Sequence, residues 1–67
     1  MMAVAKTLEI ISSSTESIEA AVREGIAKAG ETIHDIQEAW VQSTKALVND
    51  NKVVEWRVTL KITFIVK

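Results

Sequence analysis

Few side chains in this sequence are of the types that perform catalysis. His34 is the only histidine and there is no cysteine, which excludes thiol nucleophiles and thiolate metal sites. The serines at positions 12–14 stand ahead of a helical pattern, where hydroxyl groups usually cap the helix. An enzyme built on this chain would have to work through His34 or a borrowed cofactor. We therefore predict a protein that is not an enzyme.

Trp40 is the residue whose surroundings best suit ligand chemistry. Glu38 and Gln42 flank it in sequence, and a predicted hairpin places Lys61 and Arg57 on the same face of the sheet. Such a ring can be a subunit contact, because aromatic residues and Arg are enriched at interfaces. It can also be a platform for a planar ligand, with Gln42, Arg57 and Lys61 as hydrogen-bond donors. The two interpretations are compatible, since small-ligand sites often lie between subunits.

Acidic side chains offer a second kind of chemistry, the binding of a hard cation such as Ca²⁺ or Mg²⁺. The segment Asn49-Asp50-Asn51 carries oxygen ligands, but it lacks the Gly and the distal Glu of a twelve-residue calcium loop, so a turn is the better interpretation. In a symmetric assembly, one carboxylate per chain from Glu38, Asp35 or Asp50 can still meet its copies at an axis. The sequence alone assigns no metal ligand.

Length and composition limit what these residues can belong to. The 67 residues, 48% of them hydrophobic, predict a single domain spanning residues 1–67. Eight basic and nine acidic residues give a net charge of −1, which leaves no excess of cations for nucleic acid. The apolar runs are too short to span a membrane, and residues 1–6 do not have the pattern of a secretion signal. We expect a cytoplasmic protein that binds neither nucleic acid nor membrane.

A strand and a helix are predicted in the first half of the chain. Residues 3–11 are rich in β-forming side chains and predict a strand. The serines that follow predict a helix start capped by Ser14, or by Ser13 in a capping box with Glu16. The helix should end at Gly30. Its apolar positions recur at helical spacing and define one stripe: Ile18, Ala21, Val22, Gly25, Ile26, Ala29 and Ile33. A close approach of the helix backbone to the sheet would explain the Gly25 on this stripe.

The second half of the chain predicts a β-hairpin. Asn49–Lys52 is the only strong turn signal after Ile36, and apolar and polar residues alternate from Val54 to Lys67, except at Ile65. A turn of two or four residues then determines which residues face each other. The dry face is predicted to hold the pairs Val58–Ser43, Leu60–Val41, Ile62–Ala39 and Val54–Leu47. The other face is predicted to hold Glu38–Thr63, Trp40–Lys61, Gln42–Thr59 and Thr44–Arg57.

Together these elements predict an α+β fold of order β-α-β-β, in which an antiparallel three-stranded sheet is partly wrapped around one helix. Trp40 lies on the wet face, whereas Trp56 lies on the dry face as an ordinary core or rim residue. A domain of this size buries only about 60% of its unfolded surface. Disulfides are not possible without cysteine, so we expect an oligomer.

The sequence resembles the dodecin family over nearly its whole length. The similar segments are Glu9-Ile10, Ser17–Ala21, Ile26–Ala29 and Val58–Ile62, the last of them followed by Phe64. The resemblance implies protomers of order β-α-β-β assembled into a hollow homododecamer of cubic symmetry. Typical dodecins bind riboflavin, FMN or related flavins, stacking them on a Trp near a twofold axis and hydrogen-bonding them through a Gln. The resemblance also implies storage or buffering of flavin without enzymatic activity.

Two positions depart from the dodecin pattern. In an ungapped comparison anchored on Val58–Lys61, the flavin-stacking Trp falls on Glu38 and the flavin-contacting Gln falls on Arg57. Trp40 lies two residues further, about 7 Å along the same face of a strand. A subset of dodecin-like proteins lacks the flavin pair and is linked to cation binding, and Arg57 resembles that subset. The expected site comprises Trp40, Arg57, Glu38 and Gln42 and holds riboflavin or FMN; the alternative is a cage that binds calcium or magnesium, or one that is purely structural.

Overall fold

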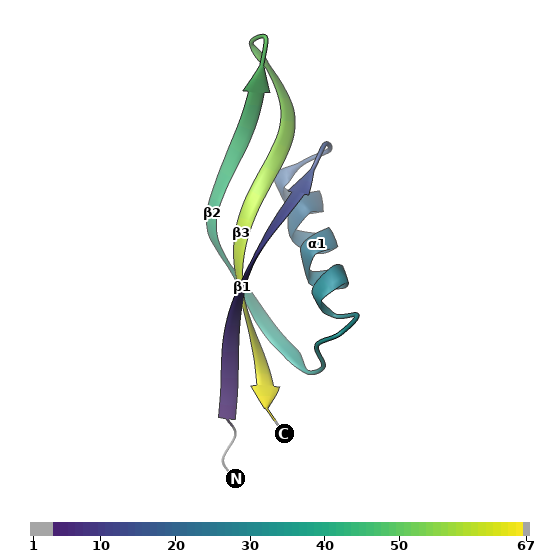
Figure 1. The fold of residues 1–67 in the computed structure, drawn as a ribbon, viewed down its shortest axis with the longest axis vertical. Coiled ribbons are helices and arrows are strands. Elements are labelled where there is room, and N and C mark those ends of the chain that lie inside the picture. The colour runs from purple at the N-terminus through teal and green to yellow at the C-terminus, as the bar shows by residue number, and fades with distance from the viewer. Residues whose placement is uncertain (1–3, 67) are drawn as a thin grey trace.

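The computed structural model describes residues 4–66 as three strands and one helix (Figure 1). In chain order they are β1 (Val4–Ser14), α1 (Ile18–Ala29), β2 (Ile36–Asn49) and β3 (Lys52–Val66). β3 lies between the two other strands and is antiparallel to both, and α1 packs on one face of the sheet (Figure 1). The predicted β-α-β-β order and antiparallel sheet are confirmed. Ala3 and Lys67, at the ends of predicted strands, lie outside the described residues.

The start of the helix differs from the prediction, because β1 continues to Ser14 by pairing with β3. The helix cap is Ser17, whose backbone is extended and whose Oγ accepts a hydrogen bond from the Ala20 backbone N–H at 3.0 Å. The predicted cap, Ser14, instead accepts a hydrogen bond from the Glu16 backbone N–H at 3.1 Å. The predictions of a Ser14 cap and of a Ser13 capping box are therefore wrong. Ser13 and Ser14, which the local pattern assigns to the helix start, pair with β3 as part of β1.

The helix approaches the sheet through its small residues. Ser12 Oγ on β1 donates a hydrogen bond to the Ala21 carbonyl of α1 at 2.7 Å. A Cβ added to Gly25 would lie 2.9 Å from Ser12 Cβ and 3.1 Å from Leu60 Cδ1. The predicted close approach at Gly25 is thus confirmed. The predicted end of the helix is confirmed as well, because Gly30 is its C-terminal cap.

The β2–β3 hairpin closes through a two-residue turn, Asp50-Asn51. Both residues have a left-handed backbone, with φ of 54° and 62°, which is the type I′ geometry that matches the twist of a hairpin. Asp and Asn adopt this conformation more readily than other residues that carry a Cβ. Asn49 consequently lies opposite Lys52, and the predicted even-length turn is confirmed.

Two bulges displace the register in the middle of the hairpin. Val54 is an extra residue on β3 and Gln42 is an extra residue on β2, so the pairing between them is shifted by one position. Near Trp40 the register is as predicted, with the pairs Glu38–Thr63, Ala39–Ile62, Trp40–Lys61 and Val41–Leu60. The other four predicted pairs are wrong, and the observed ones are Ser43–Thr59, Thr44–Val58, Lys45–Arg57 and Leu47–Glu55. Neither bulge occurs at a turn residue, and alternation of side chains alone does not reveal it.

The core lies between α1 and the central strand. Val58, Leu60 and Ile62 of β3 are 0–1% exposed and pack with Ala21 of the helix, which confirms that the even-numbered side chains of this strand face inward. Around them pack half-buried apolar residues from the other three elements, β1, α1 and β2: Ile10, Ile18, Val22, Ile26, Ala29, Ile36 and Ala39. Among residues 4–66, no helix combines the length and the apolar character that crossing a membrane would take.

The hairpin extends well past the helix (Figure 1), and the protomer measures 54 × 19 × 13 Å. The last pair between β1 and β3 is Ser14–Trp56, so the chain from about Leu47 to Glu55 forms a two-stranded ribbon. Val54, predicted on the dry face, lies in this ribbon and is 49% exposed. The helix covers only part of the sheet.

Candidate functional site

Trp40 lies on the sheet face that α1 does not cover, here called the open face. Its neighbours Ala39 and Val41 pair with the buried residues Ile62 and Leu60, and successive side chains of a strand point to opposite faces. The indole keeps 64% of its surface exposed. Lys61 lies directly opposite, with its Nζ 5.9 Å from the centroid of the indole, which is within cation–π range. Strand parity therefore placed this ring correctly.

A hollow of about 580 Å³ opens beside the indole. All three strands contribute to its lining, which consists of Thr7, Glu38, Ala39, Trp40, Lys61 and Thr63. It offers one aromatic surface, one carboxylate, one ammonium group and two hydroxyls. Such a set can stack a flat ring and form hydrogen bonds with its polar edge. We call this hollow the Trp40 site.

The sequence analysis misses Thr7, which completes the Trp40 site from β1. Thr7 lies opposite Thr63, which in turn lies opposite Glu38. No short turn connects β1 to β3, so nothing local fixes their register. The alternation of side chains along β1 is the one signal that could have placed Thr7 on the open face.

The charges around the Trp40 site are unequal. Lys61 has Glu9 directly opposite it on β1. On the other side, Glu38 is its diagonal neighbour across β2, a spacing of about 7–8 Å between Cβ atoms that long side chains can span. One ammonium group therefore stands between two carboxylates, and the local charge is negative.

Gln42 does not line the Trp40 site in the protomer. It is the extra residue of the β2 bulge, between the pairs Val41–Leu60 and Ser43–Thr59. A bulge bends its strand and re-aims the side chains there. The simple expectation that Gln42 shares the orientation of Trp40, two residues before it, neglects this bend.

Arg57 also lies away from Trp40. It lies four positions along β3 from Lys61, a distance of about 13 Å. Its Nη2 is 2.8 Å from Glu55 Oε2, and its Nε donates a hydrogen bond to Ser13 Oγ at 3.2 Å. Hydrogen bonds from Arg57, and secondarily from Ser13, hold the pKa of Glu55 below its ordinary value. Of the four predicted site residues, the protomer brings together only Trp40 and Glu38.

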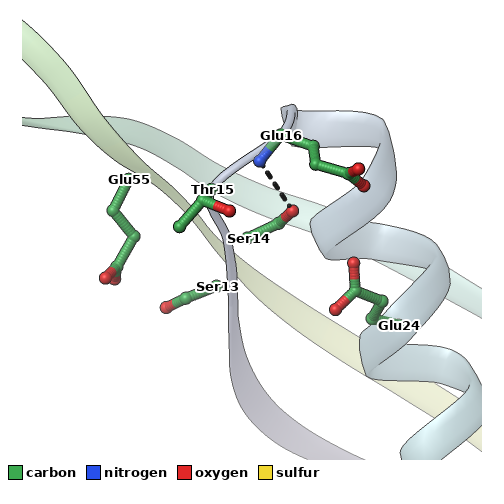
Figure 2. Close-up of a pocket in the computed structure, with 6 residues that line it drawn as sticks. All are labelled: Ser13, Ser14, Thr15, Glu16, Glu24 and Glu55. Carbon is green, nitrogen blue, oxygen red and sulfur yellow. Dashed lines mark hydrogen bonds between the residues drawn. The ribbon is translucent and has the colours of Figure 1, made fainter.

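A second hollow, of about 410 Å³, lies where β1 ends and α1 begins (Figure 2). Three hydroxyls and three carboxylates line it: Ser13, Ser14, Thr15, Glu16, Glu24 and Glu55. Figure 2 shows Glu55 and Glu24 on either side of the two serines. These oxygens are of the type that hard cations prefer. Within residues 4–66, however, no three acidic or histidine side chains are grouped so that they could hold a metal ion.

The remaining predicted candidates are far apart. His34 and Asp35 lie in the connection between α1 and β2, where they line a further hollow with Lys6 and Phe64. Asp50 lies in the hairpin turn, at the other end of the 14-residue strand β2, about 46 Å away for an extended chain. A single protomer therefore cannot combine Asp35 and Asp50 in one cation site.

A strand, a helix on one sheet face and a long hairpin define a small α+β protomer. The family model named Dodecin matches residues 4–67. The chain belongs to the dodecin family. A search of curated protein sequences found no match.

Solved structures show the same fold. A dodecin from Streptomyces davaonensis is 28% identical, with 97% of this chain and 96% of that chain covered and a TM-score of 0.92. A mutant of Thermus thermophilus dodecin is 26% identical, with 98% of both chains covered and a TM-score of 0.93. Calcium dodecin from Mycobacterium tuberculosis, a calcium-chelating antigen with a novel calcium-binding site, is 28% identical, with 96% of this chain and 91% of that chain covered and a TM-score of 0.84.

Proposed function

We propose that residues 1–67 form one dodecin domain that assembles into a cytoplasmic homododecamer and stores a flavin, riboflavin or FMN, between its subunits. Trp40 is the stacking platform and Glu38 lies beside it. A neighbouring copy would bring the more distant Gln42 and Arg57 to the ligand. The protein acts by binding and not by catalysis. The observation that carries this proposal is an indole 64% exposed on a polar sheet face, beside an ammonium group 5.9 Å from its centroid.

The distribution of apolar side chains supports assembly. Among residues 4–66, five hydrophobic residues are buried, whereas eight large ones are exposed. Val48, Val53 and Val54 are three of these eight and lie in the two-stranded ribbon. A two-stranded hairpin is marginally stable in water, and exposed apolar patches usually mark contact surfaces. A second copy that covers the ribbon would stabilise it.

The polar groups of the Trp40 site suit the edge of a flavin ring. That edge carries one N–H group between two carbonyl groups. Lys61 and Thr63 can donate hydrogen bonds to the carbonyl oxygens, and Glu38 can accept one from a hydroxyl group of the ribityl chain. The flat ring system would stack on the indole of Trp40.

Riboflavin titration of the purified protein, followed by quenching of flavin fluorescence, tests the ligand. We expect saturable quenching, an affinity about tenfold lower or worse in Trp40→Ala, and near-normal affinity in Trp40→Phe, which keeps an aromatic surface. Native mass spectrometry should show a particle of twelve chains. An intact dodecamer that leaves flavin fluorescence unchanged would overturn the flavin proposal, and a monomeric mass would overturn the assembly.

Cation binding at the second hollow is the alternative function. It is supported by the calcium-chelating relative at 28% identity; since the described residues of one protomer do not group Glu16, Glu24 and Glu55 closely enough to hold a metal ion, a neighbouring copy would have to complete the site. In a symmetric assembly, copies of Glu38, Asp35 or Asp50 could also meet at an axis. Calorimetric titration with Ca²⁺ and with Mg²⁺ tests this function. Heat that disappears in Glu55→Gln would support the second hollow, whereas binding of neither ion would leave the flavin proposal or a purely structural cage.

A further inference from the structure

The charges of the Trp40 site do not suit all flavins equally. We propose that Glu38 makes this site selective for an uncharged flavin, riboflavin, over its phosphate ester FMN. The inference rests on the proposed flavin function and names the ligand of that same site. Glu38 is then a specificity-determining residue, in addition to accepting a hydrogen bond from the ribityl chain.

Acidic side chains outnumber basic ones at the Trp40 site. Glu38 lines the hollow together with Trp40 and Lys61, and Glu9 lies opposite Lys61 on β1. Lys61 is the single cation of the lining, and its Nζ already lies near the indole, 5.9 Å from the ring centroid. Two carboxylates therefore outweigh one ammonium group where the ligand would bind.

The other cationic side chains of the open face lie far from the Trp40 site. Along the described strands, Arg57 and Lys45 are the next ones, and they form a cross-strand pair. They lie about 13 Å from Lys61 along the strand direction, and Arg57 is bound to Glu55 and Ser13. In physiological salt, charges separated by more than about 8 Å are largely screened. These cations therefore give little compensation at the Trp40 site.

The two flavins differ in charge. A phosphate ester carries about −1.5 to −2 charges at pH 7, whereas the ribityl chain of riboflavin is neutral and hydroxylated. Bringing this phosphate toward Glu38 and Glu9 adds like-charge repulsion that riboflavin does not meet. Stacking and the ring-edge hydrogen bonds are the same for both flavins, so they contribute nothing to the discrimination. The selectivity must come from the charges.

Parallel titrations of the assembled protein with riboflavin and with FMN, both followed by fluorescence quenching, test this inference. We expect riboflavin to bind about tenfold more tightly. Glu38→Gln should strengthen FMN binding relative to riboflavin binding about tenfold, because the hydrogen bond that Glu38 makes to either flavin cancels in this ratio. Glu19→Gln is the matched control, because it removes the same charge from the exposed surface of α1, where Glu19 pairs with Arg23 at 3.2 Å. It should leave both affinities unchanged.

Three other outcomes would overturn the selectivity, the role of charge or the proposed function. Equal affinity for the two flavins, or an equal effect of Glu38→Gln on both, would overturn the selectivity while leaving the flavin proposal intact. A preference that persists unchanged at 1 M salt, where screening acts over about 3 Å, would be steric and would overturn the role of charge. Absence of quenching by both flavins in an intact dodecamer would overturn the proposed function itself and this inference with it.

Discussion

The covered and open faces of one sheet differ in how far the protomer completes them. On the covered face, Val58, Leu60 and Ile62 are 0–1% exposed beneath α1. On the open face, Ile11 and Trp40 are 67% and 64% exposed. β3 supplies alternate residues to both faces, so the contrast arises from what packs on the sheet and not from the strand itself. The covered face holds the buried core of the protomer, whereas the open face keeps large apolar side chains exposed.

A charge placed on each face in turn should affect folding very differently. Val58→Asp should abolish folding, because an unpaired buried charge costs about 3–5 kcal/mol, which is comparable to the whole stability of a small domain. The neighbouring change Thr59→Asp, on the open face, should leave the fold intact. Circular dichroism and native mass spectrometry measure both results. A folded, dodecameric Val58→Asp variant would mean that the two faces have been assigned the wrong way round.

The two glycines provide the next largest contrast. Gly25→Ala places a methyl group 2.9 Å from Ser12 Cβ, so helix and sheet must separate, and we expect a loss of about 1–3 kcal/mol in the free energy of unfolding. Gly30→Ala is the matched control, since Gly30 has an ordinary right-handed helical φ of −66°. It should change the free energy of unfolding by no more than about 1 kcal/mol. Thermal melts at one fixed protein concentration compare them, because assembly makes stability concentration-dependent. Equal losses at the two glycines would contradict the close approach at Gly25.

Those elements of the fold that depend on local chemistry could be predicted from the sequence. The Asp50-Asn51 turn, the inward direction of Leu60 and its neighbours, and the close approach at Gly25 each follow from residue type and spacing. The bulges at Gln42 and Val54 could not be predicted, because an extra residue in a strand leaves no pattern of its own. The helix cap at Ser17 was missed for a related reason. Its identity depends on β1 pairing with β3 as far as Ser14, which is a tertiary contact.

Some residues of the candidate site could likewise be predicted from the sequence, and others could not. Trp40 and Glu38 could be found because the bulges at Val54 and Gln42 lie on opposite strands and cancel, so the register that the turn determines holds again beside Trp40. Arg57 was misplaced, since it lies four positions along β3 from Lys61, the residue opposite the indole, and is held by its ion pair with Glu55. Placing Thr7 at the site would have required the register between β1 and β3, which no short turn connects. The ligand and the assembly of twelve copies stay predictions, because they involve surfaces of more than one chain.

The effects of Trp40→Ala should be confined to the open face. An exposed ring contributes little to the protomer, so the change should alter the free energy of protomer unfolding by less than about 0.5 kcal/mol while it weakens assembly. Trp56→Ala is the control on the covered face, where the ring is half-buried beside Ser14, and it should lower the melting temperature. Circular dichroism and native mass spectrometry separate the two effects. Parallel losses of secondary structure and of assembly in Trp40→Ala would show that the indole supports the fold.

The smallest expected effect is the pH dependence of the Glu55–Arg57 pair on the open face. Because hydrogen bonds from Arg57 lower the pKa of Glu55 in the folded protein, the stabilisation by this pair is present above the pKa of the unfolded chain. It is lost as the pH falls through the lower pKa of the folded state. The ion pair is partly solvated, with the side chains 36% and 31% exposed, so solvent screening keeps the contribution small. Comparing melting temperatures of the protein and of Glu55→Gln from neutral to acidic pH isolates this contribution. The two should differ most at neutral pH and converge under acid, and a difference that grows as the pH falls would contradict a pair held by the ionised carboxylate.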